Sequence, residues 1–557
     1  MNSFIKKNIY YIILLVIIFI SLFLRLYKIN SNPPSLDWDE VSMGYNAYSL
    51  LKTGADEYGN RLPLNIRSFG DYKPPLYTYL AVPSISVFGF NETGVRFPSA
   101  VFGFLSVIVI YFLVKEIFKD WDKQRKEKLA LLTALFWGVS PWSLQFSRTA
   151  FEGNVGLFFF MLGFLLFLKG LKNPKIIAFA VISFSLSVYS YHSFVLVVPL
   201  FIIFCLLFFR KEVFTNIKYY IFALVIGLLF AIPVVSSFVS TGGSGSRLSM
   251  VSIFETDILI PSIKQLEYDR LQGDTLGALF DNRRVVYFLT VAKNYFDHWN
   301  PDFLFFNGDG GKQHHAVNMG MLYLWELPFI LLGVYHLLQK RTKSSLLIVI
   351  AFLIAPLPSA FSTGTPHPVR AIVMAPFFSM FSALGVINAL QKISNIKYQI
   401  LKIRIKYLIF SLGFLFFIFN FFYYIHKYYV HTPIEYSDWW QYGNKEALSE
   451  AKSLEGKYGK IIYTYKYDQP YIYYLFYNKI DPFWYQKNWD YLKTGNVERM
   501  KRIIGKYEFR NINWERDSKL NNALLIGSPE EIPENAKGLI KTIYFLDGSV
   551  AFRVVGT

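Results

Sequence analysis

The stretch IYYIILLVIIFISLFLRL, residues 9–26, decides the class of structure to which this chain belongs. A helix of this length spans roughly 27 Å at about 1.5 Å per residue, which is enough to cross the hydrocarbon core of a bilayer. Lys6-Lys7 precede it, as in a signal peptide, but no small-residue cleavage site follows. We therefore expect an uncleaved first transmembrane helix.

Apolar runs of similar length recur along the chain. They lie at residues 97–117, 129–146, 155–171, 176–189, 194–209, 220–238, 321–338, 346–361, 369–390 and 407–424. Together with residues 9–26 they predict about eleven transmembrane helices. The composition agrees, because 53% of the residues are hydrophobic and only 17% are charged, against about 25% charged in soluble proteins. We expect a multi-pass membrane protein and not a soluble enzyme.

Basic residues lie between the apolar runs in short clusters. The clusters occupy residues 119–128, 169–175, 210–218, 340–343 and 392–406. With a cytoplasmic N-terminus they all fall on the cytosolic side, as the positive-inside rule demands. We read the net charge of +18 as a mark of this topology and expect no nucleic-acid partner. The large segments 28–96 and 239–320, and the chain from 426, are then extracytoplasmic.

The expected fold is mainly α, with a polytopic helix bundle at residues 1–425 and a small extracytoplasmic α/β domain at residues 426–557. In the first outer loop, residues 39–51 predict a short amphipathic helix, capped by Asp37 or Asp39 and ended by Gly54. Residues 76–88 predict a second helix, which is too short to span and is expected at the membrane interface.

The remaining extracytoplasmic segments carry local signals. Residues 242–246, GGSGS, predict a flexible hinge. In the C-terminal domain, strands are expected at residues 460–465 and 523–526, a hairpin at 539–546 and 549–555 through Asp547-Gly548, and helices at 445–454 and 497–504. The single cysteine, Cys205, excludes an intrachain disulfide. No nucleotide-binding or Cys/His metal pattern is found in the sequence, which argues against primary pumps.

The first outer loop holds the strongest group of chemically active residues. Asp39-Glu40 follows the first span, and Asp71 and Lys73 lie near Pro74-Pro75. Carboxylates at the membrane surface can deprotonate an acceptor or hold a divalent ion. A lysine beside a rigid Pro-Pro can present its cation to a phosphate. The structural alternative is that the aspartates cap a helix and Lys73 snorkels to lipid headgroups.

Other polar residues fall on the outer side of the predicted topology. Arg148 and Arg370 stand at helix ends, where arginine can bind phosphate with two hydrogen bonds, although interfacial snorkelling would also explain them. His192 is a candidate for a substrate cavity or a satisfied interfacial histidine. Asp309 and His314 belong to one loop that could close over a substrate or bind a metal. We leave the metal, and any divalent cation, open.

Three motifs occur in an order found in one family. Asp39-Glu40 follows the first span, residues 73–77 read KPPLY, and residues 96–100 read RFPSA at the start of the second span. In this order and topology the chain resembles GT-C superfamily glycosyltransferases of the glycosyltransferase 39 type. That group includes protein O-mannosyltransferases and lipid A aminoarabinose transferases. The resemblance covers residues 1–425 and is concentrated at the N-terminal end.

The resemblance implies an enzyme that takes a sugar from a polyprenyl-phosphate donor and passes it to a protein, polysaccharide or lipid acceptor at the outer surface of the cell membrane. It implies Asp39 as the catalytic base and Lys73 as a ligand of the donor phosphate. The aminoarabinose transferases have Glu immediately before that lysine, whereas this chain has Tyr72, with Asp71 one position earlier. Whether Asp71 takes the role of that glutamate stays open.

Two other classes of protein compete with this hypothesis. A secondary transporter or lipid-linked-sugar flippase would place charges and broken helices near the middle of the membrane, often within inverted repeats. Here the spans are largely free of charge and the polar groups gather at their outer ends. A receptor or scaffold would explain an outer domain, but not Asp39-Glu40 or Lys73-Pro74-Pro75. The sequence therefore favours the transferase.

Overall fold

The computed structural model describes residues 3–69, 71–240, 252–255, 257–394, 399–488 and 502–557. The chain forms two compact units. The first unit comprises Met1–Arg25, Val101–Ser147 and Phe151–Ile425, and the second comprises Leu26–Ala100, Arg148–Ala150 and His426–Thr557. The division into a transmembrane and an extracytoplasmic domain stays a prediction.

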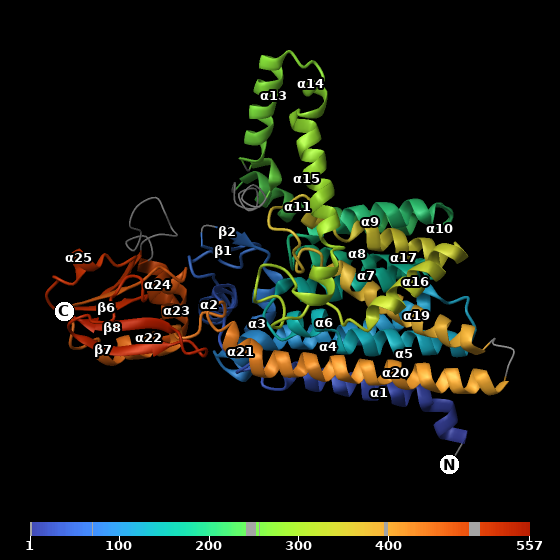
Figure 1. Cartoon of the computed structure of the whole chain (residues 1–557), viewed down its shortest axis with the longest axis horizontal. Helices are drawn as coiled ribbons and strands as arrows, with labels where there is room; N and C mark the ends of the chain where they lie inside the picture. Colours follow the sequence, from blue (N-terminus) through green and yellow to red (C-terminus); the bar gives the residue numbers. More distant parts are fainter. Residues whose placement is uncertain (1–2, 70, 241–251, 256, 395–398, 489–501) are drawn as a thin grey trace. The chain divides into compact units, whose positions relative to one another are not determined.

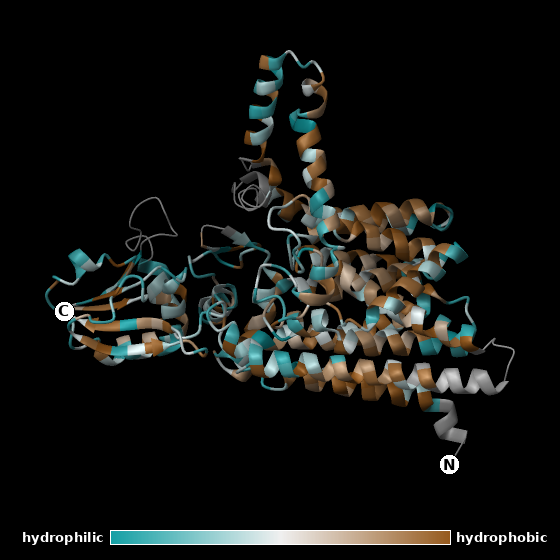
Figure 2. Ribbon diagram, viewed as in Figure 1, coloured by the Kyte–Doolittle hydropathy of each residue, from teal (hydrophilic) through white to brown (hydrophobic). Residues whose placement is uncertain are grey.

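The first unit is a bundle of apolar helices (Figures 1 and 2). Its helices are α1 (Ser3–Leu26), the part of α4 (Glu92–Ile117) from Val101 on, α5 (Lys123–Val139), α6 (Pro141–Ser147), α7 (Glu152–Gly170), α8 (Ile177–Val188), α9 (Phe194–Phe208), α10 (Arg210–Thr215), α11 (Ile217–Ser240), α16 (Glu326–Lys340), α17 (Lys343–Ile354), α18 (Leu357–Ala360), α19 (Ala375–Ser394) and α20 (Gln399–His426). Three further helices, α13 (Ile260–Gln272), α14 (Gly277–Phe280) and α15 (Arg283–Asp297), form an arm on this bundle. The mainly α membrane fold is confirmed.

The number of spans differs from the prediction. Among the described residues, 6 helices are long and apolar enough to cross a membrane, or up to 7 if the bent pair α5 and α6 counts as one. The count of about eleven is not confirmed. Part of the difference lies at the predicted spans 176–189 and 194–209, where α8 has 12 residues and α9 has 15. A helix needs about 20 apolar residues to cross the hydrocarbon core unaided.

The predicted span at residues 129–146 is broken. Helix α5 ends at Val139, α6 begins at Pro141, and their axes differ by 55°. Proline has no backbone N–H and restricts the residue before it to an extended conformation, as Ser140 shows with φ −57° and ψ 135°. The N–H of Trp142 donates to the carbonyl oxygen of Met321 at 3.1 Å, so the break costs no hydrogen bond there.

Small residues allow two helices of the bundle to approach closely. Gly333 in α16 faces Phe381 of α19, and Gly385 in α19 faces Phe329 of α16. At either glycine an added Cβ would overlap the partner's backbone carbonyl oxygen. Such contacts are how membrane helices gain packing energy where lipid supplies no hydrophobic driving force.

The second unit joins the first outer loop to the C-terminal part of the chain. The loop contributes α2 (Trp38–Thr53), β1 (Ile66–Ser68), β2 (Asp71–Lys73) and α3 (Leu76–Phe88). The C-terminal part contributes α21 (Thr432–Glu435), α22 (Asn444–Leu454), β3 (Lys460–Tyr463), α23 (Pro470–Tyr477), α24 (Pro482–Asn488), β4 (Arg502–Ile504), β5 (Tyr507–Phe509), α25 (Trp514–Asp517), β6 (Ala523–Gly527), β7 (Leu539–Tyr544) and β8 (Val550–Gly556).

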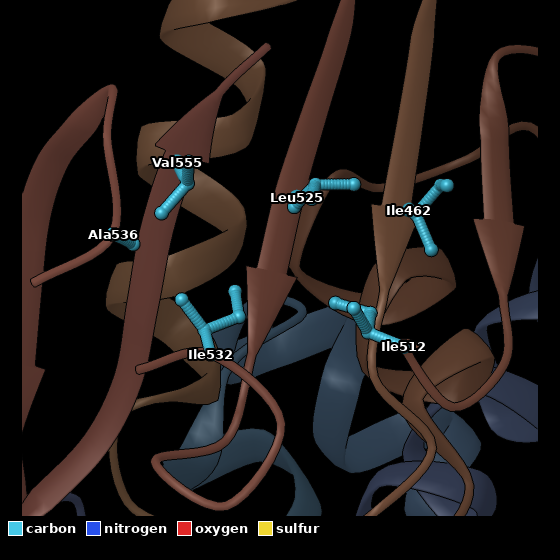
Figure 3. Packing of buried hydrophobic residues seen from close by; sticks show 6 residues of the cluster. All are labelled: Ile462, Ile512, Leu525, Ile532, Ala536 and Val555. Carbon is cyan, nitrogen blue, oxygen red and sulfur yellow. The ribbon is translucent and has the colours of Figure 1, made fainter. Parts of the chain in front are cut away.

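The C-terminal strands form one sheet in the order β4-β5-β3-β6-β8-β7. Strand β3 runs parallel to β5 and β6, and the other pairs are antiparallel. Ile462, Leu525 and Val555 on neighbouring strands pack with Ile512 and Ile532 in one apolar core (Figure 3). The predicted strands and hairpin are confirmed, and the hairpin turns through Gly548 at φ 88°.

One predicted element of this region is wrong. Residues 502–504, expected at the end of a helix spanning 497–504, form strand β4, which pairs with β5. A short apolar run is compatible with either a strand or a helix. Here hydrogen bonding to β5 at the edge of the sheet makes it a strand. The remainder of that predicted helix, and the expected hinge at 242–246, lie outside the described residues.

Helix α2 rests on the C-terminal part of the same unit. An added Cβ at Gly44 would meet the ring of Phe476 in α23 at 2.7 Å, so glycine allows the close approach. The Tyr45 hydroxyl donates to the carbonyl oxygen of Ile480 at 3.1 Å, and Gln486 donates to the Ser49 hydroxyl at 2.9 Å. The C-terminal segment thus holds the helix whose first turn carries the candidate catalytic residues.

Candidate functional site

The first turn of α2 is built by a capping box. The Asp37 carboxylate accepts from the backbone N–H of Glu40 at 2.8 Å, and Glu40 accepts from the backbone N–H of Asp37 at 3.3 Å. This arrangement satisfies two of the N–H groups that a helix start leaves open. The helix ends as predicted, at Gly54 with φ 70°. Asp37 is therefore the cap, and capping does not occupy Asp39.

Glu40 is committed to a buried ion pair with Arg96. The Arg96 Nε donates to Glu40 Oε1 at 2.9 Å and its Nη2 donates to Oε2 at 2.8 Å. The remaining guanidinium hydrogens donate to the carbonyl oxygens of Ile29, Pro33 and Ser35. All donor groups of the guanidinium are thus satisfied. Both side chains are buried, and such a pair is costly to break because either charge alone would lack a partner.

Asp39 faces the surface beside Lys73. The Lys73 ammonium forms an ion pair with Asp39 Oδ1. The lysine side chain is 5% exposed and the aspartate side chain is 41% exposed, so the cation lies below a partly accessible carboxylate. Lys73 ends strand β2, which pairs with β1, and its ammonium lies 5.2 Å from the centre of the Phe69 ring. The short hairpin thus fixes the cation at the start of α2.

Asp37 completes a compact acidic group. It is buried, and burial raises the pKa of its carboxyl well above the usual range, helped by the negative charges of Glu40 and Asp39. Three carboxyl groups within four residues thus meet the cations of Lys73 and Arg96. Asp39 is the most exposed of the three.

Arg148 lies inside the second unit. Its Nε donates to the Tyr428 hydroxyl at 3.1 Å and its Nη2 donates to the carbonyl oxygen of Asn32 at 3.0 Å. The guanidinium lies over the rings of Tyr428 and Tyr429, at 5.3 and 5.1 Å from their centres. Two residues later, the N–H of Ala150 donates to Glu40 Oε1 at 2.8 Å. Asp71 begins β2 opposite Ser68. The phosphate role of Arg148 and the catalytic role of Asp71 stay predictions.

The first unit brings two of the predicted residues into one cavity. His192 and Arg370 both line a cavity of about 480 Å³ with Tyr191, Leu196, Phe254 and Phe361. Arg370 is held there by hydrogen bonds from Nη1 to the Ser362 hydroxyl, at 2.7 Å, and to the carbonyl oxygen of Thr363, at 2.6 Å. A cavity with apolar walls and one guanidinium suits an amphiphile with an anionic head.

Asp309 and His314 are hydrogen-bonded to each other. Asp309 Oδ2 lies 2.7 Å from His314 Nδ1, and the His314 ring lies 5.6 to 5.8 Å from the rings of Phe151 and Phe146. Both ring nitrogens of His315 lie 3.0 Å from backbone carbonyl oxygens. Within the described part of the chain, no group of three or more His, Cys, Asp or Glu side chains is arranged to hold a metal ion.

The role of Arg96 escaped the sequence analysis. The residue belongs to the RFPSA motif, yet we assigned it no partner. The available signal was a charge at the start of an apolar helix, since such a group is nearly always paired. Its partner Glu40 lies 56 positions earlier, a separation that no local periodicity reveals.

Comparison with known proteins supports the resemblance. Residues 72–236 match the family described as dolichyl-phosphate-mannose-protein mannosyltransferase. A search of curated proteins gives no match. Among solved structures, the chain resembles ArnT from Cupriavidus metallidurans in the apo state, with a TM-score of 0.52 and 12% identity over 99% of this chain and 97% of that chain. The same protein bound to undecaprenyl phosphate matches with a TM-score of 0.52 and 12% identity over 100% and 98%.

An archaeal structure matches over less of its own length. The oligosaccharyltransferase of Archaeoglobus fulgidus, tethered to an acceptor peptide containing the NVT sequon, has a TM-score of 0.50 and 15% identity over 85% of this chain. The chain spans 63% of that protein. These likenesses confirm the GT-C fold expected from the motifs, and with the family match they confirm the resemblance to the glycosyltransferase 39 type.

Proposed function

Since the chain has the fold of GT-C glycosyltransferases, we propose that it transfers a sugar from a polyprenyl-phosphate donor to an acceptor at the outer face of the membrane. The observation that carries this proposal is the pairing of Asp39 with Lys73 at the start of α2. A partly exposed carboxylate beside a buried cation combines the two groups that inverting transfer from a phosphate-linked sugar needs.

Asp39 acts as the general base. It accepts the proton of an acceptor hydroxyl or amine while the acceptor atom attacks the anomeric carbon of the donor sugar. The bond between that carbon and the phosphate oxygen breaks, and its electron pair leaves with the polyprenyl phosphate. Of the three clustered carboxyl groups, Asp37 caps α2 and Glu40 holds Arg96, whereas Asp39 pairs with Lys73 and is the most exposed to a substrate.

Lys73 exchanges partners during the reaction. In the resting site its ammonium pairs with Asp39. A donor phosphate that takes over this cation frees Asp39 to accept a proton, and the cation then stabilises the charge that develops on the leaving phosphate. Donor binding and base activation are coupled in this scheme, which guards the base until the donor is present.

Arg370 and His192 serve the donor from the cavity of the first unit. The apolar wall suits the first isoprene units of the lipid, and the guanidinium suits its phosphate. Glu40 positions the first turn of α2 through its buried hydrogen bonds with Arg96 and with the N–H of Ala150. Arg148 ties the segment before α2 to Tyr428 through the carbonyl oxygen of Asn32. Asp309 with His314 contributes to binding of the acceptor or the sugar. The acceptor is a protein, a polysaccharide or a lipid.

A pair of neighbouring variants tests the proposal. In proteoliposomes supplied with a polyprenyl-phosphate sugar, Asp39→Asn should lower transfer by about 10²–10⁴-fold, the usual loss when a general base is removed. Asp37→Asn, two residues away, keeps a capping oxygen and should retain transfer. Equal transfer by wild type and Asp39→Asn would eliminate Asp39 as the base.

The role of Lys73 has its own readout. Lys73→Ala should raise the donor concentration needed for half-maximal transfer more than that of the acceptor. Lys52→Ala, in the last turn of the same helix α2, is the matched loss of a lysine and should change neither. An unchanged donor dependence in Lys73→Ala would contradict the phosphate role. Mass spectrometry of surface glycans and glycoproteins from a strain without the gene would then identify the sugar and the acceptor.

A further inference from the structure

The arm formed by α13, α14 and α15 carries large apolar side chains on its outside. On α15, Phe288 is 71% exposed, Leu289 is 58% exposed and Phe296 is 66% exposed. On α13 and α14, Leu271, Leu279 and Phe280 are exposed as well. Large apolar side chains that are exposed together on one segment indicate a binding surface for another molecule or for lipid.

The apolar residues of α15 occupy a single face. Phe288 and Leu289 precede Phe296 by eight and seven residues, which returns to the same side of a helix after two turns. Ala292 lies on this stripe between them, and Val285 lies on it one turn before Phe288. The basic residues Arg283, Arg284 and Lys293 are exposed. Arg283 lies on the opposite side of the helix, whereas Arg284 and Lys293 border the stripe, four residues from Phe288 and Leu289. The helix is therefore amphipathic, as is typical of segments that lie in a membrane interface.

The base of α15 is fixed to the outer part of the bundle. The Tyr295 hydroxyl donates to the carbonyl oxygen of Leu353 in α17 at 2.9 Å, and Trp299 packs edge-on against the ring of Phe352 at 4.9 Å. The buried Asn294 side chain donates to the carbonyl oxygens of Ala360 and Ser362. These contacts, on two sides of the base of α15, fix the direction of the helix relative to the other helices of the bundle.

That direction is across the bundle helices. Figure 1 shows α13 and α15 running across the line of α5, α7 and α20. Because spanning helices stand along the membrane normal, an arm across them lies along the membrane plane. Phe288 precedes Tyr295 by seven residues and so points to the side on which Tyr295 meets α17. This is the side of the helix bundle, and hence of the bilayer around it.

The surface continues into the lipid-facing flank of the bundle. Leu353 itself is 44% exposed beside its contact with Tyr295, and Phe361 is 40% exposed in the turn that Asn294 binds. In the arm, residues 257–297, acidic and basic side chains are nearly balanced, so apolar burial and not charge would bind it. We infer that the arm lies in the outer interface of the bilayer, with Phe288, Leu289 and Phe296 inserted among the lipid chains.

Single-cysteine labelling in lipid tests this inference. With Cys205 replaced by alanine, an environment-sensitive fluorophore is attached at Phe288→Cys, Leu289→Cys or Phe296→Cys in full-length protein in phosphatidylcholine nanodiscs. Arg283→Cys, an exposed position off the apolar stripe, is the matched control. We expect blue-shifted emission at the three stripe positions, and loss of that emission when nitroxide-labelled phosphatidylcholine is included. The control should keep water-like emission.

Each outcome decides the question. Water-like emission at all stripe positions, insensitive to nitroxide lipid, would overturn the inference. Equal quenching at Arg283→Cys and at the stripe would show that the amphipathic face does not orient the arm, and would also overturn it. Blue-shifted emission that nitroxide lipid leaves unchanged would instead indicate a protein occupant. The measurement does not depend on catalysis, so it stands or falls separately from the proposed function.

Discussion

Removal of the Arg96 side chain should unlock the first turn of α2. Arg96→Met retains a long apolar side chain but leaves Glu40, which is 3% exposed, as a buried charge without its cation. Losing one partner of a buried ion pair costs about 3–5 kcal/mol. The carbonyl oxygens of Ile29, Pro33 and Ser35 lose their donors at the same time. We therefore expect the upper end of that range.

Hydrogen exchange measures this loss where it arises. The backbone N–H groups of Asp37 and Ala150 both donate to Glu40, and their protection reports the local free energy of opening. A loss of 3–5 kcal/mol corresponds to roughly hundred-fold to few-thousand-fold faster exchange. Exchange in the β6 core strand of the C-terminal sheet serves as the internal control, since it depends on different packing.

A double variant separates charge from packing. The double variant is read at the Val41 N–H, which donates to the carbonyl oxygen of Asp37 and does not bond the Glu40 side chain. If the cost of Arg96→Met comes from the uncompensated carboxylate, this N–H should exchange more slowly when Arg96→Met is combined with Glu40→Met than in Arg96→Met alone. Wild-type protection in Arg96→Met, or faster exchange in the double variant than in the single, would refute the reasoning.

Further predictions concern pH and packing. Because folding raises the pKa of Asp37, the protonated carboxyl contributes to the free energy of unfolding. This contribution is complete below pH 3.8, the pKa of the carboxyl in the unfolded chain, and is lost as pH rises through the raised pKa of the folded state. The melting temperature of Asp37→Asn should therefore exceed that of the wild type by a margin that grows as pH rises. A margin that does not change with pH would contradict this. Burial alone would raise the pKa of Asp517, but hydrogen bonds from Arg510 and Arg516 lower it to about 2. The second unit should therefore lose stability as pH falls from 3.8 to about 2. Unfolding followed by tryptophan fluorescence should show no such loss of stability in Asp517→Asn. A loss equal to that of the wild type would count against the role of the hydrogen bonds between Asp517 and the two arginines. Finally, Gly333→Ala should destabilise the α16–α19 contact by about 1–3 kcal/mol, whereas Gly413→Ala, where an added Cβ meets nothing within 4 Å, should not. Equal free energies of unfolding for the two variants, measured in mixed micelles, would argue against the close contact.

The features predicted well from the sequence are those fixed by local chemistry. The cap of α2 at Asp37, one of two residues predicted for it, its end at Gly54 and the β7–β8 turn at Asp547-Gly548 follow from capping and turn preferences of single residues. The apolar runs likewise identify the helices of the bundle. The break at Ser140 had a local signal too, since Pro141 stands inside the predicted span, but we weighed hydropathy alone there.

The features that the sequence concealed depend on contacts between distant segments. Nothing near Glu40 announces Arg96, and nothing near Lys73 shows that its ammonium meets Asp39. Strand β4 is another case, because Arg502–Ile504 becomes a strand only by pairing with β5. The candidate residues were therefore found by type and order, whereas their division into a cap, a structural pair and a reactive pair required the fold.

Sugar transfer at the outer face of the membrane, as we propose it, requires the Asp39–Lys73 pair to lie on the non-cytosolic side. With Cys205 replaced, Leu62→Cys, which is 69% exposed in the first outer loop, can be treated with a membrane-impermeant maleimide on intact cells. Lys172→Cys, exposed in a predicted cytosolic cluster, is the control. We predict labelling of position 62 in intact cells and of position 172 only after permeabilisation. The reverse pattern would contradict the account.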